Sequence, residues 1–292
     1  MKTEGDSVGN MLWVTVRKLL PHLPMKVKRH VLWWMTYRRP VPRNPQTFME
    51  KVHWRITNDR REIIARGGDK VEMKKHAASA CPSVLIPETL WYGDDLDSIA
   101  DTDWGCEWVL KPISGAGYAE FGHGSLLSSG IDLGAVKSWR YEEAVTVQGE
   151  WAYSQARSGY LIERKIPTSN GDLPNDHRFF VFDGVVKLVQ VDSPRFQGVR
   201  RRFYTPEWEP LEDRHGDKRL ADVVSRPVNL NVMLRMASEI GAEYDFIRVD
   251  LYDTPDGIYF GEITPYPTGG LTKFSNHQFD LKLGRAWILP QV

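Results

Sequence analysis

The sequence predicts an α+β fold, because strong hairpin signals and an amphipathic helical pattern occur in the same chain. Apolar, β-rich runs at residues 246–252 and 257–263 flank a turn signal, and two further β-rich runs meet at Asp183-Gly184. Asp-Gly between such runs is a strong short-range hairpin signal. At residues 230–241 apolar side chains recur on one helical face, and Gly241 supplies a stop. An antiparallel sheet packed against a helix is therefore expected in this part of the chain.

Residues 1–44 are expected to form a basic, amphipathic N-terminal segment. Between Ser7 and Met49 there are eight Lys or Arg residues and no acidic residue, interleaved with tryptophan and leucine. Spacings of three and four residues favour short helices, which prolines would separate and stop. Residues 11–43 could lie on an anionic membrane surface or contact a partner. The rarity of exposed apolar stripes in soluble monomers favours packing on the same chain instead.

Three further regions complete the expected organisation. Residues 45–100 are predicted to be a small, mainly helical lobe, since residues 48–66 have helical periodicity. Residues 101–166 would form a lid-like α+β subdomain. Residues 167–292 would form a C-terminal subdomain that contains the hairpins and the helix at residues 230–241.

Two carboxylates stand out at the ends of the predicted strands around Pro255-Asp256-Gly257. Pairing of these strands would set Asp250 and Glu262 side by side. Two ionised carboxylates repel one another unless a cation lies between them, and Mg²⁺ prefers such oxygen ligands when it also holds nucleotide phosphates. Arg248 would share the face of Asp250 and could neutralise phosphate oxygens. An ordinary solvated hairpin with a cross-strand ion pair is the alternative.

Other segments also carry residues that could bind phosphate groups. Lys111 lies on a short apolar strand that runs into a Ser/Gly-rich loop, and glycines allow backbone N–H groups to approach an anion. The loop is neither a Walker loop nor a dinucleotide-binding fingerprint, so a flexible hairpin loop remains possible. A strand at residues 160–166 ends in charged residues, and Asp176 and Arg178 begin the hairpin at Asp183-Gly184.

The order of these motifs resembles that of the ATP-grasp ligases. The shared order is a lysine strand, a glycine loop, a strand ending in Glu, an Asp-x-Arg hairpin, an Arg-x-Asp strand and a Gly-Glu-x-Thr strand. Asp69-Lys70, the segment 204–208 and the closing Arg-Val-Asp-Leu-Tyr and Phe-Gly-Glu-Ile-Thr runs are similar to the branch named for teichuronopeptide biosynthesis (TupA-like). The likeness covers roughly residues 45–285. It implies an ATP-grasp fold in which two α+β lobes grip ATP.

The resemblance also implies roles for individual residues. Arg178 would help to stabilise the transferred phosphoryl group, and Arg248 would face the acyl phosphate. Glu163 would be the hinge acid whose strand edge receives adenine, with Ile162 packing the ring. The full set of implied nucleotide-binding residues is Lys70, Lys111, Ser114, Gly115, Gly117, Ile162, Glu163, Asp176 and Lys187. Arg195 and Arg202 lie in a basic loop that could hold an anionic acceptor, and Gly269 and Gly270 follow the last strand as a turn suited to a substrate carboxylate.

The implied Mg²⁺ ligands are Asp250, Glu262 and Thr264. Most ATP-grasp enzymes have asparagine two residues after the metal-binding glutamate, whereas this chain has Thr264. A neutral hydroxyl can still coordinate Mg²⁺, so the substitution weakens the site without excluding it.

The implied reaction is carboxylate activation by ATP and Mg²⁺, with an acyl phosphate that an amine converts to an amide or peptide bond. Candidate substrates are an amino acid, a peptide or a glycan-linked acid. Two alternatives remain: a kinase that phosphorylates a hydroxyl of a small molecule or glycan, and a non-catalytic nucleotide-binding scaffold. Thr264 is the best sequence support for the scaffold, while retention of both lysines and both carboxylates argues against it.

Composition excludes several other classes of protein. The 292 residues contain 38 basic and 38 acidic residues, which argues against a general nucleic-acid binder. Cys81 and Cys106 are too few for a disulfide framework and lack metal-ligand spacing. Without an apolar stretch of about 20 residues or a signal-peptide pattern, a cytoplasmic protein is expected.

Overall fold

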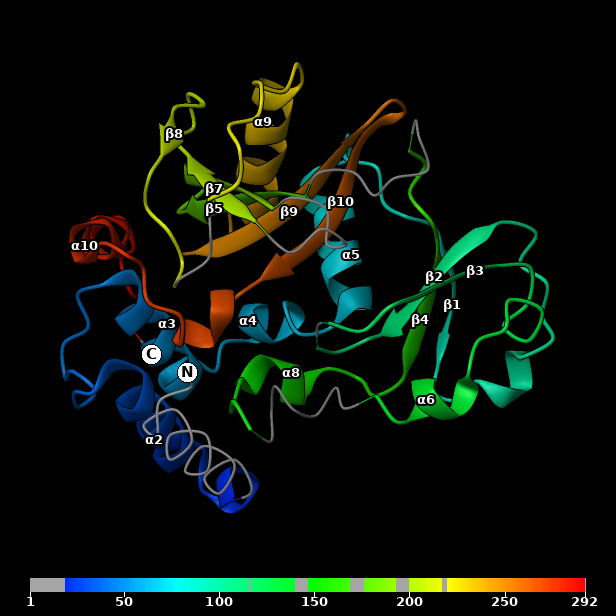
Figure 1. Cartoon of the computed structure of the whole chain (residues 1–292), viewed down its shortest axis with the longest axis horizontal. Helices are drawn as coiled ribbons and strands as arrows, with labels where there is room; N and C mark the ends of the chain where they lie inside the picture. Colours follow the sequence, from blue (N-terminus) through cyan, green and yellow to red (C-terminus); the bar gives the residue numbers. More distant parts are fainter. Residues whose placement is uncertain are drawn as a thin grey trace, which may run out of the picture.

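The computed structural model describes residues 19–115, 117–139, 147–168, 176–192, 200–216 and 220–291. Two antiparallel sheets dominate this part of the chain, and the helices lie around and between them (Figure 1). The helices are η1 (Leu20–His22), α2 (Met25–Tyr37), α3 (Phe48–Asn58), α4 (Glu62–Arg66), α5 (Lys70–Ala80), η2 (Asp97–Ile99), α6 (Leu133–Lys137), α8 (Trp151–Gln155), α9 (Leu230–Gly241), η4 (Pro267–Gly270) and α10 (His277–Ala286).

The six-stranded sheet contains both predicted hairpins. Its order is β10-β9-β5-β6-β7-β8, and its strands are β5 (Asp176–Phe182), β6 (Val185–Asp192), β7 (Arg201–Tyr204), β8 (Pro210–Leu211), β9 (Ile247–Thr254) and β10 (Gly257–Thr264). Asp183 and Gly184 join β5 to β6 with φ of 45° and 73°. Positive φ at both central residues is the backbone of the tight hairpin turn that Asp-Gly favours.

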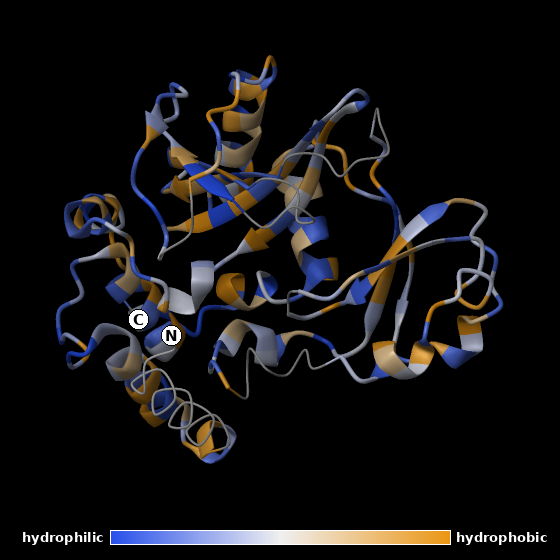
Figure 2. Ribbon diagram, viewed as in Figure 1, coloured by the Kyte–Doolittle hydropathy of each residue, from blue (hydrophilic) through white to orange (hydrophobic). Residues whose placement is uncertain are grey.

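Helix α9 has the bounds that its periodicity predicts and covers one face of this sheet (Figure 1). Its buried face presents Met233, Ala237 and Ile240 to a core shared with Val249 and Leu251 of β9. Figure 2 shows hydrophobic segments in α9 and in the strands beneath it. Burial of these side chains fixes which face of the sheet points inward, so the alternate residues of β5, β6 and β9 must face the opposite side.

The four-stranded sheet has the order β1-β4-β2-β3, from β1 (Thr89–Gly93), β2 (Glu107–Pro112), β3 (Glu120–His123) and β4 (Tyr160–Arg164). Trp108, Leu110 and Ile162 pack on one face with Val136 of α6. Strand β1 pairs with β4, although the sequence assigns residues 45–100 to a mainly helical lobe. This pairing completes the sheet and places residues 89–93 with the lid.

The helical run predicted at residues 48–66 forms two helices, α3 and α4. Thr47 and Glu50 form a reciprocal capping box that starts α3, and Asp59 ends it. Phe48 packs against Phe246 and Trp287. Helix α5 lies between the two sheets, where Val71 packs with Leu161 of β4 (Figure 1).

Helix α2 packs one face on α3. Arg29, Leu32 and Trp33 are buried, whereas Val27 and Trp34 are exposed. Part of the basic segment therefore packs on its own chain, and residues 1–18 lie outside the described ranges. No helix in the described part of the chain combines the length and apolar character needed to cross a membrane.

Candidate nucleotide and substrate site

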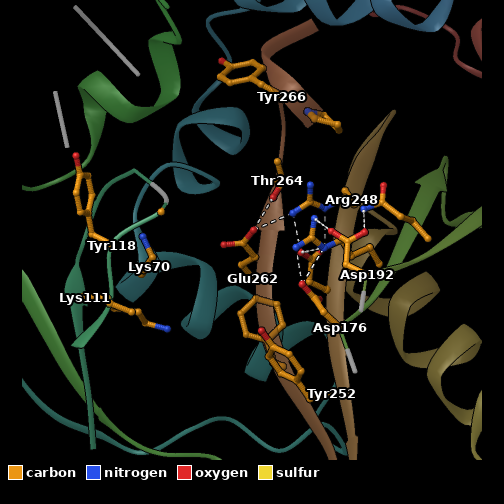
Figure 3. Close-up of a pocket in the computed structure, with 18 of the residues that line it drawn as sticks. Lys70, Lys111, Tyr118, Asp176, Asp192, Arg248, Tyr252, Glu262, Thr264 and Tyr266 are labelled. Atoms are coloured by element: carbon orange, nitrogen blue, oxygen red, sulfur yellow. Dashed lines mark hydrogen bonds and ion pairs between the residues drawn. The ribbon is translucent and has the colours of Figure 1, made fainter. Parts of the chain in front are cut away.

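A pocket of about 700 Å³ lies between the two sheets. Lys111, Tyr118 and Glu163 line it from the lid, and residues of β5, β6, β7, β9 and β10 line it from the six-stranded sheet. Figure 3 shows Lys70 and Lys111 on one side, with Glu262, Arg248, Asp176 and Asp192 on the other. The pocket thus gathers side chains from segments far apart in the sequence.

A β-bulge places the two predicted metal-binding carboxylates opposite each other. Phe260 pairs with Leu251, but Glu262, and not Gly261, pairs with Asp250. Gly261 is the extra residue, and such a bulge re-aims the side chains that follow it. The close approach needs glycine, because a Cβ there would lie 3.0 Å from the carbonyl oxygen of Asp250.

Arg248 bridges these two carboxylates. Its Nε and Nη2 donate to Asp250 at 2.7 and 2.6 Å, and Nη2 also donates to Glu262 Oε1 at 2.8 Å. Burial alone would raise the pKa of Glu262, but Arg248 and Lys70 outweigh it and lower this pKa to about 2. Burial raises the pKa of the more enclosed Asp250, and Arg248 opposes the rise. The bridge therefore keeps Glu262 ionised and binds Asp250 tightly.

Cross-strand pairing extends this network along the sheet. Asp250 pairs with Arg178 of β5, and Asp176 pairs with Asp192 of β6. Arg178 donates to Asp176 at 2.5 Å and forms ion pairs with Asp192 at 3.0 Å and Asp250 at 3.4 Å. Three carboxylates around one guanidinium hold it in a fixed orientation at the pocket floor.

The network ends at Arg201 of β7, which pairs with Asp192. Arg201 donates to the two oxygens of Asp192 at 2.7 and 2.8 Å, and its Nη1 lies 3.1 Å from His215 Nδ1. Both Arg201 and His215 line the pocket. A bidentate arginine–carboxylate pair gives this end of the floor a defined shape.

On the opposite side, Lys70, Lys111 and Glu163 line the pocket, and Lys74 lies within ion-pair distance of Glu163 without lining the pocket. Lys111 and Lys74 both form ion pairs with Glu163. Burial would raise the pKa of Glu163, but the charges of Lys111 and Lys74 lower it. Burial and then the charge of Lys111 lower the pKa of Lys70 to about 8, so a negative ligand here would be stabilised by two neighbouring cations.

Helix α5 positions two of these lysines. Asp69 caps it by accepting from the backbone N–H groups of Val71 and Glu72. Lys70 and Lys74 share one face of this helix because they are four residues apart. Lys70 Nζ also donates to the carbonyl of Gly115 at 2.5 Å, which connects α5 to the glycine loop.

The structure brings most predicted site residues to this pocket. Those that line it are Lys70, Lys111, Gly117, Glu163, Asp176, Arg178, Arg248, Asp250, Glu262, Thr264 and Gly269. Gly115 borders it through its bond from Lys70. Arg195 and part of the glycine loop lie outside the described residues.

Five predicted residues lie elsewhere, and strand parity explains most of them. Ile162 faces the lid core, and Lys187 is exposed. Arg202 follows Arg201 on β7, so its side chain points to the opposite face of the sheet, where it donates to the carbonyl of Ala221. Ser114 is buried against the carbonyl of Tyr153, and Gly270 packs beside Val52. None of these five lines the pocket.

The strand edge predicted to receive adenine is closed. Both edges of β4 are paired, with β1 on one side and β2 on the other. Lys165 and Ile166, which follow β4, line the pocket together with Val109 and Phe260. The apolar surface suited to a base therefore comes from these residues and not from Ile162.

Sequence reasoning missed several pocket residues. Asp192, Arg201 and His215 were not singled out as partners of the Asp-x-Arg element, and Glu150 and Tyr153 were missed altogether. Lys74, which forms an ion pair with the pocket residue Glu163, was also missed. The spacing of Lys70 and Lys74 was a usable signal, because residues four apart on a helix share a face. No local signal marks Glu150, which enters the pocket from a loop.

The two α+β lobes each contain an antiparallel sheet, and they face each other across a pocket of lysines, arginines and paired carboxylates. This arrangement defines an ATP-grasp fold. The model of the TupA-like ATP-grasp family matches residues 50–288, and the chain belongs to that family. Membership of this family implies ATP binding. No curated protein matches the chain.

Solved structures with a similar fold include three ligases. The D-cycloserine synthetase DcsG is 15% identical with a TM-score of 0.41, and the match covers 77% of this chain and 70% of DcsG. D-alanine–D-alanine ligase from Bacillus anthracis, complexed with ATP, is 16% identical with a TM-score of 0.38, covering 70% and 56%. The ATP-grasp ligase PsnB, complexed with a minimal precursor, is 12% identical with a TM-score of 0.38, covering 70% and 54%. The chain thus spans little more than half the length of the last two.

Proposed function

We propose that this protein is an ATP-dependent carboxylate–amine ligase, which forms an amide or peptide bond and releases ADP and phosphate. One observation carries the proposal: Lys70 and Lys111 face Arg248 and Glu262 across a single pocket. Phosphoryl transfer to a carboxylate requires positioning and neutralisation of negative charge, not a covalent nucleophile on the protein. An amino acid, a peptide or a glycan-linked acid would suit this chemistry as acid substrate.

The order of residues along β10 supports a direction for the bound nucleotide. Phe260 precedes Glu262 on β10 and lines the pocket, as do Val109 and Ile166. Thr264 and Tyr266 continue beyond Glu262 (Figure 3). A base at the apolar end would place the phosphates between the lysines and Glu262. The acceptor would then lie beyond Thr264 or over the Arg178 network.

The residues present fit a nucleotide-bound Mg²⁺. No group of three or more His, Cys, Asp or Glu side chains in the described ranges could hold a metal ion by itself. Mg²⁺ beside a nucleotide usually takes only one or two carboxylates and completes its shell with phosphates and water. Oε1 of Glu262 accepts from Arg248 and Thr264, which leaves Oε2 available, and Asp250 would be the second ligand. The bound ion would neutralise charge on the phosphate oxygens.

The reaction follows from these groups. A substrate carboxylate oxygen attacks the γ-phosphorus, the bond to the bridging oxygen breaks, and ADP leaves. Lys70 and Lys111 would hold the phosphates, and Arg248 would neutralise the charge on the transferred group. The amine nitrogen then attacks the acyl carbon, inorganic phosphate leaves, and the amine loses a proton. Exclusion of water between the lobes would protect the acyl phosphate from hydrolysis.

Hydroxylamine trapping tests the proposal against a kinase. The purified protein is incubated with Mg·ATP and a panel of amino acids, dipeptides and uronic acids, and ADP release identifies the acid. Replacement of the amine by hydroxylamine should then give a hydroxamate, since this nucleophile captures an acyl phosphate. A stable phosphorylated product without hydroxamate would support the kinase, and no ADP release with any acid would count against both.

A further inference from the structure

Beyond Thr264, residues of η4 line the pocket together with residues of the loop that precedes α8. Glu150, in this loop, is 6% exposed and lines the pocket with Gln148 and Gly269. Within the described part of the chain, the carboxylate of Glu150 accepts no side-chain hydrogen bond and forms no ion pair, although Arg29 acts on it through its charge. A buried carboxylate that accepts no hydrogen bond is costly even beside a cation, so a ligand that donates to it is its natural complement.

Two side-chain oxygens converge on the space above Gly269. A Cβ at Gly269 would lie 2.8 Å from Glu150 Oε1 and 2.9 Å from Gln148 Oε1. Gly269 has φ of 59°, and its neighbour Thr268 has φ of 54°, a conformation that a β-branched residue rarely adopts. The Thr268 hydroxyl is buried without a hydrogen-bond partner among the described residues. Strained backbone and open acceptors at one pocket end are features of a ligand site.

Glu150, Gln148 and Gly269 are here called the cradle, and Arg29 of α2 holds it together. Its guanidinium donates to the carbonyl of Gln148 at 3.0 Å and to that of Gly269 at 2.7 Å. Nη1 and Nη2 of this fully buried arginine are thus directed at the two backbone carbonyls, with His53 Nδ1 also 3.4 Å from Nη2. Among the described residues, none of its nitrogens donates to the side-chain oxygens of Glu150 or Gln148, which can meet a ligand. The lid loop and η4 are joined by one residue that precedes the family match.

The chemistry of the cradle selects a protonated amine. An ammonium group has three donors and a positive charge, which match the Glu150 and Gln148 oxygens. Glu150 would repel an anionic group, and a hydroxyl would leave its charge uncompensated. The carboxylates of the phosphate site lie elsewhere, on β9 and β10.

We propose that Glu150, Gln148 and Gly269 form the subsite for the primary amine of the second substrate. The inference rests on the proposed ligase function, because only a ligase would use an amine. The bound ammonium would pass one proton to the Glu150 carboxylate, the freed lone pair would attack the acyl carbon, and the carbon–oxygen bond would break to release phosphate. Burial raises the pKa of Glu150 to about 7, with Arg29 opposing, which suits a proton acceptor near neutral pH.

Thermal unfolding with amine probes tests this subsite. Wild type, Glu150→Gln, Glu150→Asp, Gly269→Ala and the exposed control Glu62→Gln are each unfolded with Mg·ATP alone. The measurement is repeated with Mg·ATP plus one of the twenty common amino acids or its amide, and with the N-acetyl form of each. The Nα-acetyl forms retain the side chain but cannot carry the α-ammonium charge.

At least one amine should raise the wild-type midpoint by a few degrees above Mg·ATP alone, and its N-acetyl form should not. Glu150→Gln and Gly269→Ala should keep the Mg·ATP shift, which reports that they are folded, and lose the amine shift. Glu150→Asp should keep part of it, and Glu62→Gln all of it. An amine shift that survives in both Glu150→Gln and Gly269→Ala would overturn the subsite, as would a wild type that responds to Mg·ATP but to no amine. A wild type that fails to respond to Mg·ATP would instead remove the proposed function.

Discussion

At the scale of single residues, Glu163 shows how the pocket keeps cations in place before a nucleotide arrives. Its carboxylate is buried and forms ion pairs with Lys74 of α5 and with Lys111 of β2. Two cations on one carboxylate leave a net positive charge on this side of the pocket. That surplus is available to phosphate oxygens, and it comes with a preset geometry.

Lys111→Met tests this function of the lysines. The variant should bind ATP at least tenfold more weakly, about 1.4 kcal/mol or more, because one phosphate-binding charge is lost. Glu163 keeps Lys74 as a partner, so the fold should persist. Isothermal titration with Mg·ATP measures the affinity. Lys187→Met is the matched control, because Lys187 is exposed and outside the pocket; equal affinities for both variants would contradict the assignment.

Glu150 makes a prediction about pH and stability. Its pKa is raised to about 7 in the folded protein, from an ordinary value of 4.5, because burial disfavours the charged form. The folded state then binds more protons than the unfolded state between these values, so stability falls as pH rises through about 7. The groups that face Glu150 are Arg29, Tyr153 and Tyr266.

Glu150→Gln should remove this contribution. Relative to wild type, the variant should gain up to about 3 kcal/mol in free energy of unfolding at pH 8 compared with pH 4.5, at roughly 1.4 kcal/mol per unit of pKa shift. Urea unfolding of both proteins at the two pH values measures the difference. Parallel pH profiles would show that Glu150 ionises at its ordinary pKa.

At the scale of elements, the β9–β10 hairpin depends on its bulge. Counting pairs from the turn, a regular hairpin would set Gly261 opposite Asp250, since Thr254 pairs with Gly257 and Leu251 with Phe260. The extra residue advances the register by one and brings Glu262 to Asp250. Because a shift of one residue reverses the face of every later side chain, the bulge decides that Glu262 enters the pocket.

Gly261→Val should therefore disrupt both packing and site. A Cβ at Gly261 would lie 2.8 Å from the Tyr252 ring and 3.0 Å from the Asp250 carbonyl, so the strands must move apart. We expect a loss of about 1–3 kcal/mol in free energy of unfolding and a weaker response to Mg·ATP. Urea unfolding measures the first and thermal unfolding the second. Lys187→Val, at an exposed strand position, should change stability by less than about 0.5 kcal/mol; an equally small effect at Gly261 would mean that the bulge is dispensable.

Features set by local signals could be predicted from the sequence, whereas features that depend on strand register could not all be predicted. Turn chemistry and periodicity predicted both hairpins and α9, because these signals are local. The predicted meeting of Asp250 and Glu262 was confirmed, although it needs a bulge that the sequence analysis did not predict. Gly261, a glycine inside a strand pattern, was the local signal for that bulge. Arg202 was chosen over Arg201, and Ile162 was assigned to adenine, because the parity of β7 and β4 depends on loops and pairing partners. Glu150 is placed by tertiary packing through Arg29, so its sequence neighbourhood carries no trace of its position.

At the scale of the whole molecule, the N-terminal helix α2 is joined to the pocket. Arg29 connects it to the lid loop and η4, and the Tyr37 hydroxyl donates to the carbonyl of Gly270 at 3.1 Å. The segment that the sequence marked as basic and amphipathic thus supports the part of the pocket lined by Gln148 and Gly269. Its exposed Trp34 and Val27 remain available for other contacts.

Arg29→Met should weaken the whole assembly. Two buried carbonyls would lose their donor, at about 1–3 kcal/mol for each unsatisfied group. We expect a lower unfolding midpoint and an intact response to Mg·ATP, because the nucleotide contacts lie elsewhere. Differential scanning calorimetry of Arg29→Met and of Lys26→Met, an exposed residue on the same helix, provides the comparison. If both variants unfold at the wild-type temperature, α2 does not support the fold.

The central claim is that the two lobes bind Mg·ATP through the carboxylates of the bulged hairpin. The most direct measurement is the thermal unfolding midpoint with and without Mg·ATP, for wild type and for Asp250→Asn/Glu262→Gln, with far-ultraviolet circular dichroism to show that the variant is folded. The wild-type midpoint should rise by a few degrees at about a hundredfold excess of ATP over its dissociation constant, only when Mg²⁺ is present. The folded variant should show no such rise. An unchanged wild-type midpoint, or an equal rise in the variant, would contradict the account.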